Sequence, residues 1–196
     1  MPRLHYVTWA EYGDLVTKLA EDIASTGKKF DLVVGIARGG IPVAMVVADR
    51  LDTRVDFLNV KSYTDVGERV KPRILTTITE DIFGKRVLLV DDLVDGGATM
   101  ETVTRYLDSE GPKSLTTAVL FTKPWSTFSP DYSLRVVDTW VVFPYERGEV
   151  RRSRSPKRQK QLVSQGLSKA SETLAPGPGL VRRARRSQQA SSVFAQ

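Results

Sequence analysis

Two adjacent carboxylates stand between an apolar run and a glycine-rich turn, and these residue types at this spacing are well suited to chemistry. The segment reads Val87-Leu88-Leu89-Val90-Asp91-Asp92-Leu93-Val94-Asp95-Gly96-Gly97-Ala98-Thr99. The apolar run predicts a buried strand, and the turn after it predicts the start of a helix. Backbone N–H groups of residues 95–99, together with the helix dipole, would form an anion site suited to a phosphate.

The polar groups of this segment match the needs of a phosphorylated sugar. Gly96 and Gly97 allow the backbone to approach a phosphate closely, and the Thr99 hydroxyl can donate a hydrogen bond to it. The carboxylates of Asp91 and Asp92 can accept hydrogen bonds from vicinal ribose hydroxyls or hold a magnesium ion. The segment therefore predicts a site for a ribose phosphate.

The pattern excludes two common phosphate-binding motifs and resembles a third. No GxxxxGK[ST] P-loop occurs, and residues 35–40 do not match the GxGxxG dinucleotide fingerprint. The order of apolar strand, acid pair, spacer, Gly-rich turn and Thr resembles the motif with which type I phosphoribosyltransferases bind phosphoribosyl pyrophosphate (PRPP). The resemblance covers about residues 5–148. It implies a set of PRPP-binding residues: Asp91, Asp92, Asp95, Gly96, Gly97, Ala98 and Thr99.

Two further segments resemble the same family. The sequence Ala37-Arg38-Gly39-Gly40 is similar to the loop that receives the pyrophosphate leaving group, where a non-proline cis peptide is common. Residues 61–72 are polar and aperiodic, and they stand where the family has a flexible loop that closes over the reaction. Ser62-Tyr63 resembles the start of that loop. An ordinary surface loop is an equal alternative for this stretch.

Residues near the end of this region resemble the base pocket of the short 6-oxopurine members of the family. Lys123 matches a lysine that donates to the purine O6, and Trp140 matches an aromatic residue that stacks on the purine. Main-chain groups near Val141 would contact position 2 of the base. The run Phe143-Pro144-Tyr145-Glu146 resembles a Pro-Trp-acid motif that closes the pocket, with Tyr in place of Trp. The resemblance makes Glu146 a base-binding residue, although Asp is more usual there.

The resemblance implies a reaction in which a purine nitrogen attacks C1 of the ribose and pyrophosphate leaves, through a transition state with oxocarbenium character. Catalysis would then depend on the placement of charge. Asp91 and Asp92 would hold the ribose and Mg²⁺, and Asp95 would manage the proton on purine N7. A plain helix-start acid is an equal alternative for Asp95. Lys123 would select 6-oxo bases, because its ammonium group donates hydrogen bonds and cannot accept them.

Two alternative functions remain open at this stage. One is a phosphoribosyltransferase for adenine or a pyrimidine, which Lys123 and Trp140 disfavour. The other is a regulatory protein that senses PRPP on the same fold. The acid pair, Asp95 and Lys123 favour the enzyme, and no helix-turn-helix pattern precedes them.

The elements expected to position these residues alternate between strands and helices. Thr8 and Glu11 form a capping box, and apolar residues at helical spacing follow to Ile23. Further helices are predicted over 42–51 and from about residue 97 to a stop at 111–112. Apolar runs predict strands at 31–36, 55–60, 74–78, 86–91, 115–121 and 136–143. This order predicts an α/β fold, a mainly parallel sheet flanked by helices, with a flexible loop and a small base-binding hood. Ligands bind such sheets beyond the carboxyl ends of the strands.

The composition limits the class of protein. The 196 residues are 41% hydrophobic and 27% charged, as in an ordinary globular chain. The absence of cysteine excludes disulfides and thiolate metal sites. No stretch approaches the roughly 18 apolar residues of a membrane span, and the first residues lack the apolar core of a secretory signal. These features predict a cytoplasmic enzyme with no membrane partner.

The net charge of +6 comes from the end of the chain. Residues 151–196 hold 11 Lys/Arg and one acid, which leaves 18 basic and 22 acidic residues, a charge of −4, in residues 1–150. We therefore expect a phosphoribosyltransferase domain over 1–150 and a basic, disordered tail over 151–196. Nucleic acid is an expected partner only through that tail, and a tail without function is an equal alternative. The family resemblance implies a homodimer or higher homo-oligomer.

Overall fold

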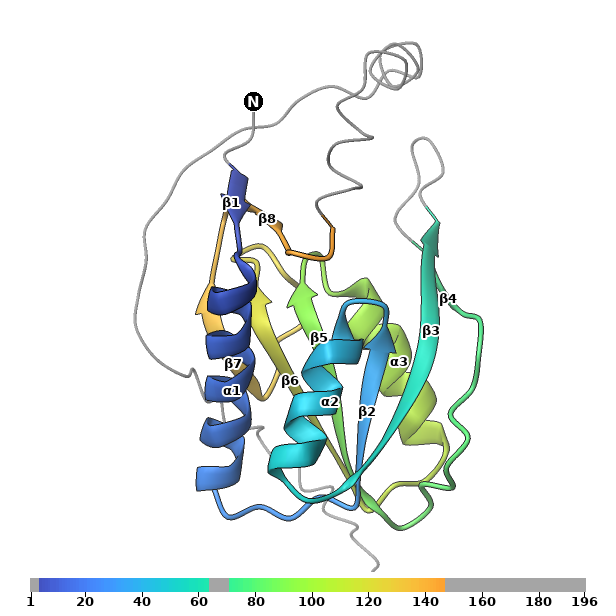
Figure 1. Cartoon of the computed structure of the whole chain (residues 1–196). Coiled ribbons are helices and arrows are strands. Elements are labelled where there is room, and N and C mark those ends of the chain that lie inside the picture. The colour runs from blue at the N-terminus through green and yellow to red at the C-terminus, as the bar shows by residue number, and fades with distance from the viewer. Residues whose placement is uncertain (1–3, 64–70, 147–196) are drawn as a thin grey trace, which may run out of the picture.

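The computed structural model describes residues 4–63 and 71–146 of the chain, and within them helices cover both faces of a central sheet (Figure 1). The elements follow one another as β1 (Leu4–Tyr6), α1 (Trp9–Ser25), β2 (Leu32–Ala37), α2 (Gly40–Arg50), β3 (Arg54–Tyr63), β4 (Lys71–Ile74), β5 (Arg86–Val94), α3 (Ala98–Ser109), β6 (Ser114–Thr122), β7 (Tyr132–Val136) and β8 (Trp140–Val142). Residues 64–70 of the expected flexible loop and the whole of the expected tail lie outside the described residues.

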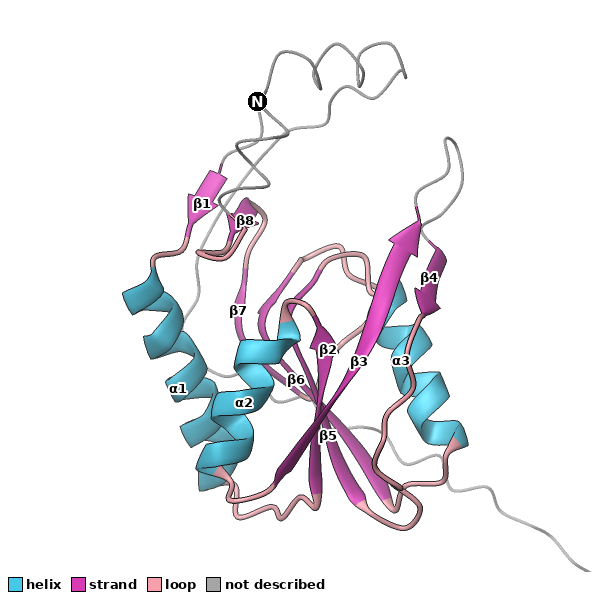
Figure 2. Ribbon diagram, turned by 45° about the vertical axis from the view of Figure 1, so that its right-hand side comes forward, coloured by secondary structure: helices cyan, strands magenta, loops and turns pink. Residues whose placement is uncertain are grey.

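The main sheet has the strand order β4-β3-β2-β5-β6-β7. All neighbouring strands in it run parallel except β3 and β4, which pair antiparallel. A second, two-stranded parallel sheet joins β1 to β8 beside the carboxyl ends of the main strands (Figure 2). The predicted α/β fold with a mainly parallel sheet is confirmed.

Alternate residues of the central strands pack into two separate cores. Val33 and Leu88 belong to the core beneath α1 and α2, whereas Val34 and Leu89 belong to the core beneath α3. Since side chains alternate across a strand, a sheet covered on both faces requires apolar residues at every position. This requirement explains the unbroken apolar runs in the sequence.

The predicted helices are confirmed. The Thr8 hydroxyl accepts a hydrogen bond of 3.1 Å from the Glu11 amide, as the capping box requires. The apolar residues of α1 at helical spacing are buried, and so are Met100, Val103 and Leu107 of α3.

Four predicted strands need correction. β3 continues past Val60 to Tyr63, into the stretch expected to be a loop, because it pairs there with β4. β5 continues past Asp91 to Val94, because its pairing with β6 persists to the end of both strands. The strand expected at 74–78 is wrong: β4 occupies Lys71–Ile74 instead. As an edge strand it can accommodate Pro72 and needs no apolar run, so its signal in the sequence is weak.

The single strand expected at 136–143 is also wrong. β7 ends at Val136, and β8 begins only at Trp140 in the other sheet. The start of β7 holds Tyr132 and Leu134, which are buried on either side of a serine. The predicted single strand is divided because β8 leaves the main sheet to pair with β1, which lies at the other end of the described chain.

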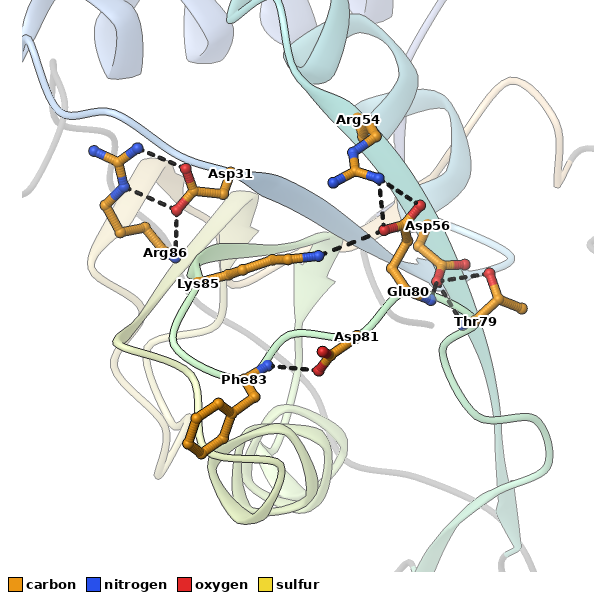
Figure 3. A network of polar contacts seen from close by, with 9 residues as sticks. All are labelled: Asp31, Arg54, Asp56, Thr79, Glu80, Asp81, Phe83, Lys85 and Arg86. Atoms are coloured by element: carbon orange, nitrogen blue, oxygen red, sulfur yellow. Dashed lines mark hydrogen bonds and ion pairs between the residues drawn. The ribbon is translucent and has the colours of Figure 1, made fainter.

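Polar contacts at the opposite end of the sheet from the carboxyl ends hold the β4–β5 connection (Figure 3). Asp56 of β3 accepts hydrogen bonds from the amides of Phe57 at 2.7 Å, Thr79 at 2.6 Å and Glu80 at 2.9 Å. Burial by itself would raise the pKa of Asp56, but these donors lower it overall. The Asp56 carboxylate therefore satisfies two backbone N–H groups of the β4–β5 connection, those of Thr79 and Glu80.

No helix in the described part of the chain combines the length and the apolar character needed to cross a bilayer.

Candidate active site

A pocket of about 770 Å³ opens at the carboxyl ends of β2, β3 and β5. This is the edge of a parallel sheet at which ligands bind. The segments that line it are the turn after β2, the end of β3, the acid pair of β5, the start of α3 and the segment after β8. The lining residues are Trp9, Ile36, Ala37, Arg38, Gly39, Ile41, Pro42, Asn59, Val60, Lys61, Leu75, Asp91, Asp92, Thr99, Tyr145 and Glu146.

The acid pair reaches this pocket because two neighbouring strands end at different points. β2 pairs with β5 only as far as Gly35 opposite Val90, whereas β6 continues alongside β5 to Val94. The turn after β2 then leaves the sheet, so Asp91 and Asp92 border the space beyond the last β2–β5 pair. The carboxylates are thus held by a rigid strand on one side and face a ligand-sized space on the other.

The turn after β2 packs directly against the acids. The Ala37–Arg38 peptide is cis, as the resemblance led us to expect. A Cβ atom at Gly39 would lie 2.2 Å from Oδ2 of Asp92, and one at Gly40 would lie 2.7 Å from the Val90 carbonyl oxygen. Both positions therefore require glycine, which brings main-chain groups of the turn beside the carboxylates.

The turn before α3 has a backbone conformation that favours glycine. Gly97 has a φ of +100°, and an added Cβ would lie 2.7 Å from the Phe128 amide nitrogen. The N–H groups of the first turn of α3 include those of Ala98 and Thr99. They point with the positive end of the helix dipole toward the pocket edge, where Thr99 is a lining residue.

The two acids perturb each other. Burial raises the pKa of Asp91 well above its ordinary value, and the neighbouring charge of Asp92 adds to this effect. Burial also raises the pKa of Asp92, while a hydrogen bond from the Tyr145 hydroxyl opposes the rise. Two carboxylates this close, Asp91 buried and Asp92 half-buried, are best stabilised by a cation or by hydroxyl donors from a ligand.

The donor set fits magnesium held jointly with a phosphorylated ligand. Within the described residues no group of three or more His, Cys, Asp or Glu side chains could enclose a metal ion. Mg²⁺ characteristically binds one or two protein carboxylates and completes its shell with water and substrate phosphates. Asp91 and Asp92 supply such a pair.

An aromatic cluster missed by the sequence reasoning closes one side of the pocket. Tyr145 stacks on Phe143 with ring centroids 5.4 Å apart and packs edge-on against Tyr12 at 5.6 Å. Its hydroxyl lies 2.5 Å from Oδ2 of Asp92. Trp9, at the first position of α1, is tilted toward Tyr145 at 6.5 Å. A Tyr where the family motif has Trp was the only signal in the sequence for this contact.

Most of the residues expected to act on the base lie outside this pocket. Glu146 lines the pocket with the acid pair, but Lys123, Trp140, Val141 and Asp95 do not. The Lys123 side chain is buried, and its ammonium group contacts the Thr139 carbonyl oxygen. Trp140 is 57% exposed, while Val141 beside it is buried.

Lys123 and Asp95 share a neighbour instead. The indole N–H of Trp125 donates to Oδ1 of Asp95 at 2.9 Å, and the Trp125 ring centroid lies 5.3 Å from Nζ of Lys123. Burial lowers the pKa of Lys123, and the charges of Asp95 and Asp138 oppose this effect. The described structure thus presents one preformed pocket around the acid pair and a separate polar cluster around Trp125.

Comparison with known proteins points to one family. A family model described as phosphoribosyl transferase domain matches residues 6–149. A xanthine-guanine phosphoribosyltransferase of Ruegeria sp. is 40% identical over 124 residues, which cover 58% of this chain and 67% of the relative. A transcriptional regulator GfcR of Methanococcoides burtonii is 31% identical over 129 residues, or 60% of this chain and 63% of the regulator.

A solved structure agrees with these sequence matches. The purine phosphoribosyltransferase from Pyrococcus horikoshii superposes with a TM-score of 0.66 at 34% sequence identity. The superposition covers 72% of this chain and 93% of that protein. The likeness in fold therefore extends over most of this chain.

Proposed function

The chain belongs to the phosphoribosyltransferase domain family, and we propose that it transfers the phosphoribosyl group of PRPP to a 6-oxopurine base. The base is hypoxanthine, guanine or xanthine, and the products are the nucleoside 5′-monophosphate and pyrophosphate. The observation that carries the proposal is the packing of three segments around one pocket. These are the acid pair of β5, the glycine turn after β2 and the start of α3.

Each segment suits one part of PRPP. The turn at 95–99 and the dipole of α3 would bind the 5′-phosphate, with Gly96, Gly97, Ala98 and Thr99 offering their amides. Asp91 and Asp92 would accept hydrogen bonds from the ribose 2′- and 3′-hydroxyls. Such donors would relieve the mutual destabilisation of the two neighbouring carboxylates. The ligand would thereby stabilise the folded protein as well as occupy its pocket.

The leaving group would lie against the turn at 37–40. Main-chain amides of the turn at Gly39, which lines the pocket, together with the Arg38 guanidinium, would stabilise the negative charge that develops on pyrophosphate. Magnesium held by Asp91 and Asp92, when bound, would supply further positive charge there. Placing these groups in advance lowers the cost of separating charge as the bond at C1 breaks.

The chemical step exchanges one bond at C1 for another. The C1–O bond to pyrophosphate breaks and its electron pair leaves with that oxygen, while a purine nitrogen lone pair forms the new C1–N bond. Asp95 would accept the proton that the purine loses. The carboxylates near the ribose would stabilise the positive charge that passes through the ring in the transition state.

Selection among bases would depend on Lys123. An ammonium group donates to an oxygen at position 6 but offers no acceptor to an amino group there, so adenine would leave both partners unpaired. Trp140 is sufficiently exposed to stack on a base, and Val141 and Glu146 would complete the set of base-binding residues. The similarity to xanthine-guanine phosphoribosyltransferases supports this choice of base.

A second candidate function is a regulatory protein that binds PRPP without turnover. The similarity to the GfcR regulator favours it, although that match covers less of the relative than the enzyme matches do. In both functions PRPP would occupy the same pocket. Only the enzyme requires Asp95 and Lys123 to act on a base.

The deciding experiment measures pyrophosphate release from PRPP and Mg²⁺ with hypoxanthine, guanine, xanthine or adenine. We expect turnover with 6-oxopurines and little with adenine. We further expect Asp92→Asn to impair PRPP use and Lys123→Ala mainly to weaken discrimination between oxo- and aminopurines. PRPP binding without turnover of any base would favour the regulator, and unchanged kinetics in both variants would reject the residue assignments.

Deletion of residues 151–196 tests the proposed boundary of the catalytic domain. We expect the shortened chain to keep its activity. Loss of activity would show that the domain extends past residue 150. Sedimentation of the full chain tests the homo-oligomer that the family resemblance implies.

A further inference from the structure

Trp125 lies between two residues to which the proposed reaction gives separate tasks. Its indole N–H is bonded to the Asp95 carboxylate, and its ring faces the Lys123 ammonium at 5.3 Å. Its side chain is 56% exposed, so it does not serve to fill the core. None of the motifs that identify the family includes it.

The position of Trp125 is set by main-chain contacts between two loops. The Lys123 amide donates to the Val94 carbonyl at 2.9 Å, and the Thr127 amide donates to the Gly96 carbonyl at 3.2 Å. The Thr127 hydroxyl donates to the same Gly96 carbonyl at 2.9 Å. Contacts on both sides of Trp125 thus attach its loop to the turn that carries Asp95. Because the backbone fixes both partners, the indole reaches Asp95 with little loss of side-chain entropy.

We propose that Trp125 is a positioning residue for Asp95 and a specificity-determining residue for the base, acting through Lys123. The inference rests on the proposed function and deepens it. The indole bond engages one carboxylate oxygen of Asp95, so the second oxygen is oriented to receive the purine proton. The electron-rich face of the ring stabilises the ammonium form of Lys123, which is the form that donates to a 6-oxo group.

The two roles depend on different parts of one side chain, so two substitutions separate them. Trp125→Phe removes the N–H and keeps an aromatic face near Lys123. Trp125→Ala removes both. The exposed Phe83 lies on the loop before β5, away from the pocket, and Phe83→Leu serves as the control that leaves activity unchanged.

We expect Trp125→Phe to lower kcat by about tenfold, the effect of losing one hydrogen bond to a charged group, with KM for PRPP within about twofold. Its preference for hypoxanthine over adenine should persist. Trp125→Ala should show the same loss in kcat and also reduce that preference by about fivefold or more, in line with a cation–π contact of about 1 kcal/mol. In an Asp95→Ala background, Trp125→Phe should have no further effect on kcat, because the carboxylate that the indole positions is already absent.

Several results would overturn the inference. Wild-type kcat in Trp125→Phe removes the positioning role, and an unchanged base preference in Trp125→Ala removes the specificity role. Additive losses in the double variant would show that Trp125 acts independently of Asp95. If the wild-type chain releases no pyrophosphate with any of the four bases, the proposed function fails and this inference fails with it. An active wild type with unaffected variants rejects the inference alone.

Discussion

The hydroxyl of Tyr145 donates a hydrogen bond of 2.5 Å to Oδ2 of Asp92, which joins the segment after β8 to the acid pair in the middle of the chain. The same ring stacks on Phe143 and packs against Tyr12, so its direction is fixed from two sides. Burial strongly raises the pKa of the Tyr145 hydroxyl, and the charge of Asp92 adds to that rise, so it remains a donor at every working pH. One carboxylate of the candidate PRPP site is therefore oriented by a residue that lies 53 positions further along the chain.

Replacing Tyr145 with Phe removes this donor and keeps the aromatic stack. We expect KM for PRPP to rise by about five- to thirtyfold, because Asp92 loses a hydrogen-bond donor worth about 1–2 kcal/mol. KM for the purine should change little. Steady-state kinetics with each substrate varied in turn measures the two constants. Equal changes in both would mean that Tyr145 supports the whole pocket rather than Asp92.

Gly39→Ala should abolish PRPP binding while the protein still folds. The new Cβ would lie 2.2 Å from Oδ2 of Asp92, so the acid or the turn after β2 must move. Calorimetric titration with PRPP and Mg²⁺ measures the loss. Gly13→Ala is the matched control, because a Cβ there meets nothing within 4 Å and lies inside α1. That control should bind PRPP normally and gain about 0.5–1 kcal/mol of stability. Normal binding by Gly39→Ala would contradict the packing of the turn against the acids.

Asp91→Asn should raise the thermal stability of the ligand-free protein at neutral pH. Since burial raises the pKa of Asp91, the folded state binds more protons than the unfolded state between the ordinary and the raised pKa. Stability therefore falls as pH rises through that window, and a neutral amide avoids the loss. The Asn side chain can still accept the hydrogen bond from the Asp92 amide.

Melting curves in a chelating buffer at about pH 7 and pH 3 test this prediction. The gain should be present at the higher pH and absent at the lower one, below the ordinary carboxyl pKa of about 3.9. PRPP binding by the variant should be weaker at pH 7. A loss of stability at pH 7 would show that the Asp91 carboxylate is already well compensated without ligand.

Asp56→Asn should show the opposite dependence on pH. Its folded-state pKa is lowered despite burial, so its stabilising effect is present above the ordinary carboxyl pKa and is lost as pH falls through the lowered one. We expect a loss of about 2 kcal/mol at pH 7, since charge-assisted hydrogen bonds to Thr79 and Glu80 are weakened. The difference from wild type should shrink below about pH 4. Urea unfolding at several pH values measures it, and a constant difference would assign the effect to shape rather than charge.

The strand–turn–helix segment that defines the candidate site could be read from local sequence. Buried parallel strands need apolar residues on both faces, and a helix entered from a tight turn needs glycine. These requirements leave a continuous pattern from Val87 to Thr99. The same logic identified α1 from its capping box and the buried faces of α1 and α3 from their spacing. Local chemistry was sufficient because each signal lies within about a dozen residues.

Contacts between distant residues were decided only by the tertiary structure. The break between β7 and β8 follows from the pairing of β8 with β1, and the close approach of Gly39 to Asp92 joins the turn after β2 to β5. The bonds from Tyr145 to Asp92 and from Trp125 to Asp95 likewise span 53 and 30 residues. The spacing of residues within one segment does not predict such pairs, because they depend on which strands lie next to each other in the folded sheet. The sequence by itself determined which groups could do the chemistry, and the packed sheet determined which of them touch.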